Sequence, residues 1–152
     1  VDTSRKGFLV ALDISAYSLV SIARYAAPLM AERDGSIVTL TFQASTRVFP
    51  GYNVMGTAKA ALENEVRQLA SDLGRDGIRV NAISAGPLDT LSSRAIAGYR
   101  DMKRAHAERS PMGRNITPEE VAKTALFLCS DLSSGVTGEI VHVDTGYNIM
   151  GI

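Results

Sequence analysis

Hydrophobic and polar positions along the chain predict alternating helices and strands. Residues 8–30 are apolar on most faces and predict one long helix, largely buried, with Pro28 near its end. Three short apolar runs, at 36–42, 78–85 and 138–146, predict buried strands, and glycine or proline punctuates each of them. Because helical patterns separate these strands, we expect the strands to pair in parallel.

Two more helices are expected between the strands. Strong helix formers with apolar positions three and four residues apart predict a helix from Tyr52 to about Leu73. A second helix begins with a clear start signal, in which Thr117 caps, Pro118 takes the first helical position and Glu120 completes a capping box. The stretch 88–109 between them is polar and predicts a flexible segment with a helix-like second half.

The order of the elements predicts an α/β fold, a doubly wound parallel sheet in three αβα layers with right-handed crossovers. Such a domain usually begins with a glycine-rich strand-turn-helix that holds a dinucleotide pyrophosphate. No such glycine cluster follows a strand here. Either the protein binds no dinucleotide or that half of the domain is absent. The start at Val1, without an initiator methionine and directly before a helical pattern, favours absence.

Composition narrows the classes of function. Lysine plus arginine and aspartate plus glutamate both number 16, and this zero net charge argues against nucleic-acid binding. No uninterrupted run of about eighteen apolar residues is present, so we expect no membrane-spanning helix. The lone cysteine, Cys129, lies in an apolar run, which predicts a buried side chain and is typical of a cytoplasmic protein.

Four polar residues receive no firm assignment from the sequence. His106 and His142 have no partners at metal-ligand spacing, so no metal site is predicted. Asp13 and Ser15 interrupt the long helical pattern of residues 8–30. A hydrogen bond to nearby backbone and a place near a cofactor are equally supported for these two.

Three segments carry a resemblance to a known family. They are TLTFQASTRVFPGYNVMGTAKAALE, GIRVNAISAGPLDTL and SGVTGEIVHVDTGYNIMG. Together they resemble the NADH-dependent enoyl-acyl-carrier-protein reductases of bacterial fatty acid synthesis, a divergent branch of the short-chain dehydrogenase/reductase family. The resemblance implies a Rossmann-type domain of which residues 1–152 are the carboxyl-terminal part, without the nucleotide-binding half. It also implies reduction of a trans-2 enoyl thioester by hydride from NADH.

Tyr52 and Lys59 are the expected catalytic pair. Most short-chain dehydrogenases place tyrosine and lysine four positions apart, but that position holds Met55 here. The enoyl reductase branch places them seven positions apart, as Tyr52 and Lys59 are. Both would lie on one helix face if Tyr52 is already helical. A phenol can stabilise the enolate oxygen that forms during hydride transfer, and the resemblance implies that Lys59 holds the nicotinamide ribose.

The resemblance also assigns a cofactor site at the end of the second strand. It implies that NADH or NAD contacts the backbone at Leu88 and the hydroxyl of Thr90. Asp89 departs from the family, which usually has arginine there, and its carboxylate would repel a pyrophosphate unless it points outward. The implied cofactor-binding residues are Lys59, Ala85, Gly86, Pro87, Leu88, Thr90 and Ser92.

The substrate pocket is expected beside Tyr52. Phe42 stands where many members have a second tyrosine, so it can wall the pocket but cannot donate a hydrogen bond. The helical spacing after Ser92 matches the family's mobile flap, whose marginal stability suits a lid. The expected pocket residues are Phe42, Tyr52, Met55, Ile96, Tyr99 and Met102.

Partners follow from the same resemblance. The flap has a basic side, with Arg94, Arg100, Lys103 and Arg104, which could steer acidic acyl carrier protein. A solvated helix face explains these residues at least as well, since Asp101 and Glu108 dilute the positive charge. Family members are typically homotetramers. Two alternatives stay open: another short-chain dehydrogenase that acts on a ketone or alcohol, and a fragment that associates without catalysis.

Overall fold

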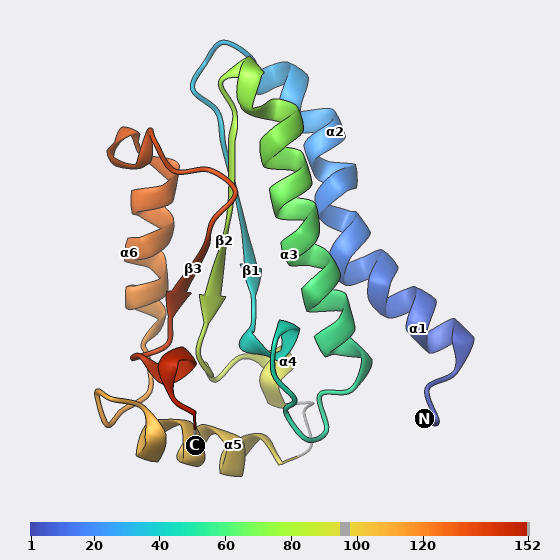
Figure 1. Cartoon of the computed structure of the whole chain (residues 1–152), viewed down its shortest axis with the longest axis vertical. Helices are drawn as coiled ribbons and strands as arrows, with labels where there is room; N and C mark the ends of the chain where they lie inside the picture. The colour runs from blue at the N-terminus through green and yellow to red at the C-terminus, as the bar shows by residue number, and fades with distance from the viewer. Residues whose placement is uncertain (95–97, 152) are drawn as a thin grey trace.

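The computed structural model describes residues 1–94 and 98–151, in which a three-stranded parallel sheet lies between two helical layers (Figure 1). One layer holds α3 and a long amino-terminal rod, which consists of α1, a π-helical segment and α2 and spans Arg5–Met30. The other layer holds α6. The elements are α1 (Arg5–Leu12), a π-helical segment (Asp13–Tyr17), α2 (Ser18–Met30), β1 (Ser36–Thr41), α3 (Val54–Leu73), β2 (Arg79–Ala85), α4 (Leu91–Arg94), α5 (Tyr99–Arg109), α6 (Pro118–Cys129) and β3 (Ile140–Val143). The predicted α/β layers and the three strands are confirmed.

The sheet has the order β1-β2-β3, and both pairings are parallel. The crossover from β1 to β2 uses α3, whereas the crossover from β2 to β3 uses α6 on the opposite face (Figure 1). Two crossovers that step in the same direction but use opposite faces cannot have the same hand. The expectation of right-handed crossovers throughout is therefore wrong for one of them. The long excursion through α4 and α5, below the strand ends, gives the chain room to change faces.

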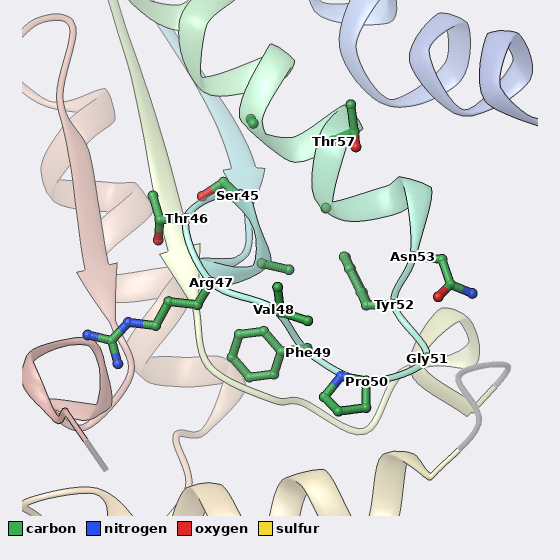
Figure 2. Close-up of a pocket in the computed structure, with 13 residues that line it drawn as sticks. Ser45, Thr46, Arg47, Val48, Phe49, Pro50, Gly51, Tyr52, Asn53 and Thr57 are labelled. Atoms are coloured by element: carbon green, nitrogen blue, oxygen red, sulfur yellow. The ribbon is translucent and has the colours of Figure 1, made fainter. Parts of the chain in front are cut away.

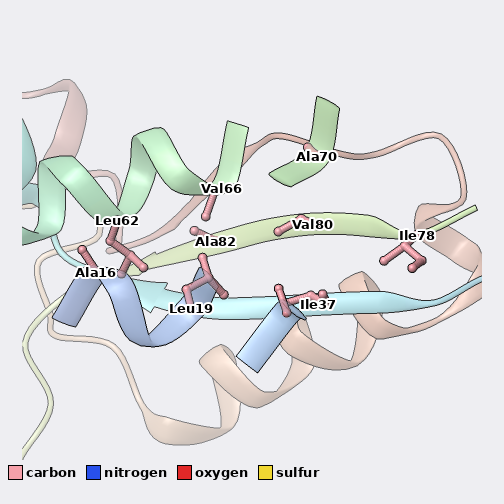
Figure 3. Packing of buried hydrophobic residues seen from close by; sticks show 10 residues of the cluster. Ala16, Leu19, Ile37, Leu62, Val66, Ala70, Ile78, Val80 and Ala82 are labelled. Carbon is pink, nitrogen blue, oxygen red and sulfur yellow. The ribbon is translucent and has the colours of Figure 1, made fainter. Parts of the chain in front are cut away.

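The larger core lies between the sheet and the α2–α3 layer (Figure 3). Val80 and Ala82 of β2, and Ile78 just before the strand, point into it at alternate positions, and all three are almost fully buried. Leu62 and Val66 of α3 pack on them, at the four-residue spacing of one helix face. Burying a side chain of this size contributes about 1.5–3 kcal/mol, so this face is what fixes α3 on the sheet.

The opposite face is covered by α6. Thr117 and Glu120 form the predicted capping box, with the Thr117 N–H donating to the Glu120 carboxylate at 2.8 Å. Leu128 of α6 packs against Ile83 of β2, and both are fully buried. The adjacent Cys129 is exposed, so its predicted burial is wrong. Neighbouring residues of a helix point in different directions, so a helix that buries one face leaves some residues of an apolar run exposed.

The amino-terminal helical rod is one continuous element, but it is not largely buried as predicted. Ala16, Leu19 and Ala23 face the core, whereas large apolar side chains on its other face are exposed. By length and composition alone, Arg5–Met30 is long and apolar enough to cross a membrane, with a mean hydropathy of 1.4. The expectation of no such helix is wrong by that measure. A helix that packs in the core of a protein can pass the same test.

Candidate active site

The carboxyl ends of the three strands meet at one edge of the sheet, where several loops gather (Figure 1). The loop after β1 carries Tyr52, the loop after β2 carries Leu88 and Thr90, and the segment after β3 carries Tyr147. Helix α5 runs across this edge. In open α/β sheets, ligands bind in the crevice beyond the strand carboxyl ends. The chain's candidate residues therefore converge where this fold places ligands.

Tyr52 lies in a turn just before α3, and the expectation that it is already helical is wrong. The reason is the next residue, Asn53, whose backbone has φ 49° and ψ −133°. A positive φ in a residue other than glycine is strained and clusters at functional sites. Tyr52 therefore projects from the loop that precedes α3 and not from the helix itself (Figure 2). Burial raises the pKa of the Tyr52 phenol, so the phenol stays protonated and can donate a hydrogen bond at neutral pH.

Lys59 reaches the same strand end from the second turn of α3. Its Nζ donates to the carbonyl oxygen of Leu40, the penultimate residue of β1, at 3.0 Å. Burial lowers the pKa of Lys59, and the Glu63 carboxylate opposes that shift. One hydrogen bond leaves two of the three ammonium protons for other acceptors. Lys59 can therefore bind hydroxyl groups of a ligand while anchored to β1.

Aromatic rings continue from Tyr52 along the site. The Phe42 ring lies 5.2 Å from the Tyr52 ring and 4.7 Å from the Phe49 ring, between centroids. Phe49 in turn lies 6.5 Å from Tyr147, which stacks on His106 at 4.5 Å. Such pairs contribute about 0.5–1.5 kcal/mol each beyond the area they bury. The chain of rings joins the Tyr52 loop to the carboxyl-terminal segment and to α5.

Arg47 makes a second link between the Tyr52 loop and the carboxyl-terminal segment. Its guanidinium donates to the carbonyl oxygens of Asn148, at 2.7 Å, and Met150. Figure 2 shows Arg47 directed away from α3, while Tyr52 points toward it. The loop and the first turns of α3 enclose a cavity of about 520 Å³ lined by residues 44–53, Gly56, Thr57 and Ala60. The ring contacts from Phe42 to Tyr147 and the Arg47 hydrogen bonds both tie the loop to the carboxyl-terminal segment, and they hold the outer wall of this cavity in place.

The loop after β2 presents backbone and side-chain groups to the strand ends. Leu88 is half-buried, and among the described residues its N–H has no hydrogen-bond partner, whereas its carbonyl accepts from the Tyr99 hydroxyl. The Thr90 hydroxyl accepts from the Ser93 N–H at 3.1 Å and caps α4. Asp89 pairs with Lys103, and its side chain is 65% exposed. The carboxylate therefore points outward and does not crowd the site.

The predicted pocket residues do not all meet. Met102 lines a second cavity, of about 650 Å³, between α5 and the Tyr52 loop. Tyr99 is buried against Leu88 rather than in that cavity, and Met55 turns its sulfur toward the Ser15 hydroxyl at 4.0 Å. The backbone of Ser92 lies in α4, Ala85 ends β2, and Gly86 and Pro87 are buried beyond it. Ile96 lies outside the described residues.

His106, which received no assignment from the sequence, is a buried ionisable group. It is 4% exposed, and within residues 1–94 and 98–151 neither ring nitrogen has a hydrogen-bond partner. A Cβ on Gly86 would lie 3.1 Å from its Nε2, so a larger residue there would require the neighbouring atoms to shift by a few tenths of an ångström. Burial lowers the pKa of His106, and the Asp144 carboxylate offsets this only in part. The imidazole is therefore neutral when α5 is packed on the strand ends.

Acid should weaken the packing of His106. Because its pKa is lower in the folded chain than in the unfolded chain, its contribution to stability is complete above the unfolded value, about 6.5. That contribution falls as the pH drops below this value, with a slope of at most about 1.4 kcal/mol per pH unit. Urea unfolding between about pH 8 and pH 5 should show this slope in the wild type and not in His106→Gln. His142→Gln, an exposed histidine on β3, is the matched control, and a slope unchanged in His106→Gln would contradict the prediction.

The sequence pointed to Tyr52, Lys59 and the loop after β2 but missed three residues of the site. Arg47 and Asn53 gave no signal, since nothing local marks a distant carbonyl partner or a positive φ. Glu63 looked like an ordinary helix former in a segment rich in them. It is 5% exposed and accepts a hydrogen bond from Thr41.

Comparisons with known proteins agree with this geometry. Residues 1–148 match the family described as enoyl-(acyl carrier protein) reductase. The chain is 52% identical over 152 residues to the enoyl-[acyl-carrier-protein] reductase [NADH] FabI of Aquifex aeolicus. The solved reductase from Aquifex aeolicus VF5 superposes with a TM-score of 0.96, at 53% identity and over 99% of this chain. That of Anaplasma phagocytophilum, in complex with NAD, superposes with a TM-score of 0.93 at 49% identity and over 99% of this chain.

The match covers only part of each relative. The chain spans 56% of the Aquifex aeolicus reductase, 59% of its solved chain and 57% of the Anaplasma phagocytophilum chain. The structure therefore describes this sheet and its strand ends without the rest of the length that those relatives have.

Proposed function

We propose, from the premise that this chain belongs to the enoyl-(acyl carrier protein) reductase family, that it forms the catalytic-pair half of an NADH-dependent enoyl reductase. The reaction is reduction of the trans-2 double bond of an enoyl thioester in fatty acid biosynthesis. The observation that carries the proposal is the convergence of Tyr52 and Lys59 on the end of β1. Lys59 bonds Leu40 there, and Tyr52 packs on Phe42 two residues later.

The described residues fit a nicotinamide cofactor. The Leu88 N–H, which has no hydrogen-bond partner within residues 1–94 and 98–151, suits a carboxamide oxygen, and Lys59 keeps two donors for ribose hydroxyls. Asp89 points outward into its pair with Lys103, so its carboxylate does not oppose a pyrophosphate. We assign Lys59, Leu88 and Thr90 as the central cofactor contacts of this half. Bound NADH supplies the hydride.

Tyr52 supplies the electrostatic part of catalysis. As hydride reaches the β-carbon of the enoyl thioester, negative charge develops on the thioester oxygen. The protonated Tyr52 hydroxyl donates a hydrogen bond to that oxygen and stabilises the enolate, as oxyanion-hole donors do. Phe42 adds an apolar wall without a second phenol. The half-buried site keeps water away and strengthens the hydrogen bond.

The substrate carrier and the assembly belong to the same proposal. Acyl carrier protein would dock near α5, where Lys103 and Arg104 lie, and would compete with their present partners Asp89 and Asp101. The exposed apolar face of the amino-terminal rod would be covered in a homotetramer. The chain would form one domain with an amino-terminal segment that completes the nucleotide site, in the cytoplasm.

The test is activity of the reductase that contains this segment. Purified protein should oxidise NADH in the presence of a trans-2-enoyl thioester and should not oxidise secondary alcohols with NAD. Activity on alcohols alone would favour the ketone or alcohol dehydrogenase alternative. Lys59→Ala should raise the dissociation constant for NADH measured by calorimetry, and unchanged NADH affinity would remove Lys59 from the proposed site.

A further inference from the structure

Two side chains of α3 hold the last two residues of β1. Lys59 donates from Nζ to the Leu40 carbonyl at 3.0 Å. One helical turn later, the Glu63 carboxylate accepts from the Thr41 hydroxyl at 2.8 Å. Residues four apart lie on the same helix face, with Cβ atoms about 5–6 Å apart. The lysine and the carboxylate therefore reach the strand end as neighbours.

The burial of the Glu63 carboxylate at the end of β1 costs free energy. Glu63 is 5% exposed and Thr41 is 4% exposed. Burying a carboxylate is costly unless it is paired and hydrogen-bonded. The guanidinium of Arg67 donates to the Glu63 backbone carbonyl, so it does not serve as the partner of the carboxylate. The nearby charge of opposite sign that acts on this position is that of Lys59.

We propose that Glu63 is a positioning residue that acts through Lys59: with Thr41 as its anchor, it keeps the Lys59 ammonium charged and directed at the strand end. The inference rests on the proposed function in one respect, because the charge of Lys59 matters for function only if Lys59 contacts the cofactor. It concerns the charge and place of Lys59, which exist without any bound ligand.

The electrostatics give the inference a direction. Burial lowers the pKa of Lys59, and the Glu63 carboxylate opposes this. Removing the carboxylate should therefore lower the pKa of Lys59 further. A lysine is charged below its pKa, so any binding that needs the charge is complete at low pH and is lost as the pH rises through the pKa. Without Glu63, that loss should occur at a lower pH.

Other ionisable groups lie on the elements packed against α3. These are Asp13 and Tyr17 of the π-helical segment, Arg5 and Lys6 of α1, Arg24 and Tyr25 of α2, Arg79 of β2, and Arg75 and Asp76 after the helix. Tyr52 is protonated at neutral pH because burial raises its pKa. Within the described part of the chain, Glu63 is the charged group that shifts Lys59.

The experiment follows the Lys59 titration directly. Protein labelled with ¹³C at lysine Cε is titrated by NMR without cofactor, and the Lys59 signal is assigned by its absence in Lys59→Met. Glu63→Gln should move the Lys59 midpoint to lower pH, whereas Glu63→Asp, which keeps the charge, should preserve most of it. Glu65→Gln makes the same charge change two residues away, on another face of α3, and should leave the midpoint where it is.

A second measurement ties the result to binding. In the complete reductase, NADH affinity should fall as the pH rises and Lys59 loses its proton. This fall should occur at a lower pH in Glu63→Gln than in the wild type. Equal Lys59 midpoints in folded wild type and Glu63→Gln would overturn the inference, and so would equal shifts in Glu63→Gln and Glu65→Gln. If Glu63→Gln does not fold, Thr41→Val keeps the test open, because it removes the hydroxyl that holds the Glu63 carboxylate: a Lys59 midpoint unchanged in Thr41→Val would overturn the inference. A shifted midpoint in a protein without enoyl reductase activity would instead refute the proposed function.

Discussion

Tyr52→Phe should lower kcat for reduction of a trans-2-enoyl thioester by about 10²–10³-fold, the usual cost of one oxyanion donor. The reason is that the phenol hydrogen bond strengthens as charge develops in the transition state, and the adjacent Phe42 offers no replacement donor. KM should change little, because an interaction made only in the transition state affects kcat and kcat/KM alike. The loss of NADH absorbance in steady-state and single-turnover assays measures both.

The control is Tyr25→Phe, which removes a phenol hydroxyl from an exposed position on α2. It should retain wild-type turnover. Phe42→Tyr is a second test, because it adds a hydroxyl to a ring that packs directly against Tyr52. If it restores part of the activity in a Tyr52→Phe background, a positioned phenol is the catalytic requirement. Wild-type turnover in Tyr52→Phe would show that another group stabilises the enolate.

Gly56→Ala should reduce the free energy of unfolding by about 1–3 kcal/mol, as overpacking does. Gly56 lies in the first turn of α3, where a Cβ would stand 2.7 Å from the Ala44 carbonyl oxygen. That oxygen belongs to the backbone at the start of the Tyr52 loop, so it cannot turn aside as a flexible side chain would. The helix and the loop must separate, and the cavity that they enclose must widen. Urea unfolding measures the loss.

Gly74→Ala is the matched control for this prediction. Gly74 follows the other end of the same helix with φ −61°, and a Cβ there would meet nothing within 4 Å. The substitution should stabilise the chain by about 0.4–1 kcal/mol, because alanine has less conformational freedom to lose on folding. Equal effects at the two positions would mean that the close approach of Gly56 to Ala44 has no energetic role.

Local patterns predicted most of the fold because they reflect local physics. The capping box at Thr117 and the strand bounded by Gly77 and Gly86 are decided by neighbours in sequence, and both are as predicted. The burial of the amino-terminal rod was predicted wrongly, since apolar content does not state which face another element covers. The single departure from right-handed crossovers depends on the route of some thirty residues below the strand ends, which no short pattern encodes.

The sequence by itself determined that Tyr52 and Lys59 form the candidate pair, since the identity and spacing of two residues in a motif require no coordinates. Only the tertiary structure decided how they are presented. The positive φ of Asn53 removes Tyr52 from the helix, and Glu63 and Thr41 place a buried carboxylate beside Lys59. The physical reason is that hydrogen bonds across tens of residues, such as those of Arg47 to the carboxyl-terminal segment, depend on the packed arrangement of elements. Burial and pKa depend on that same arrangement, so they become definite only when the chain is folded.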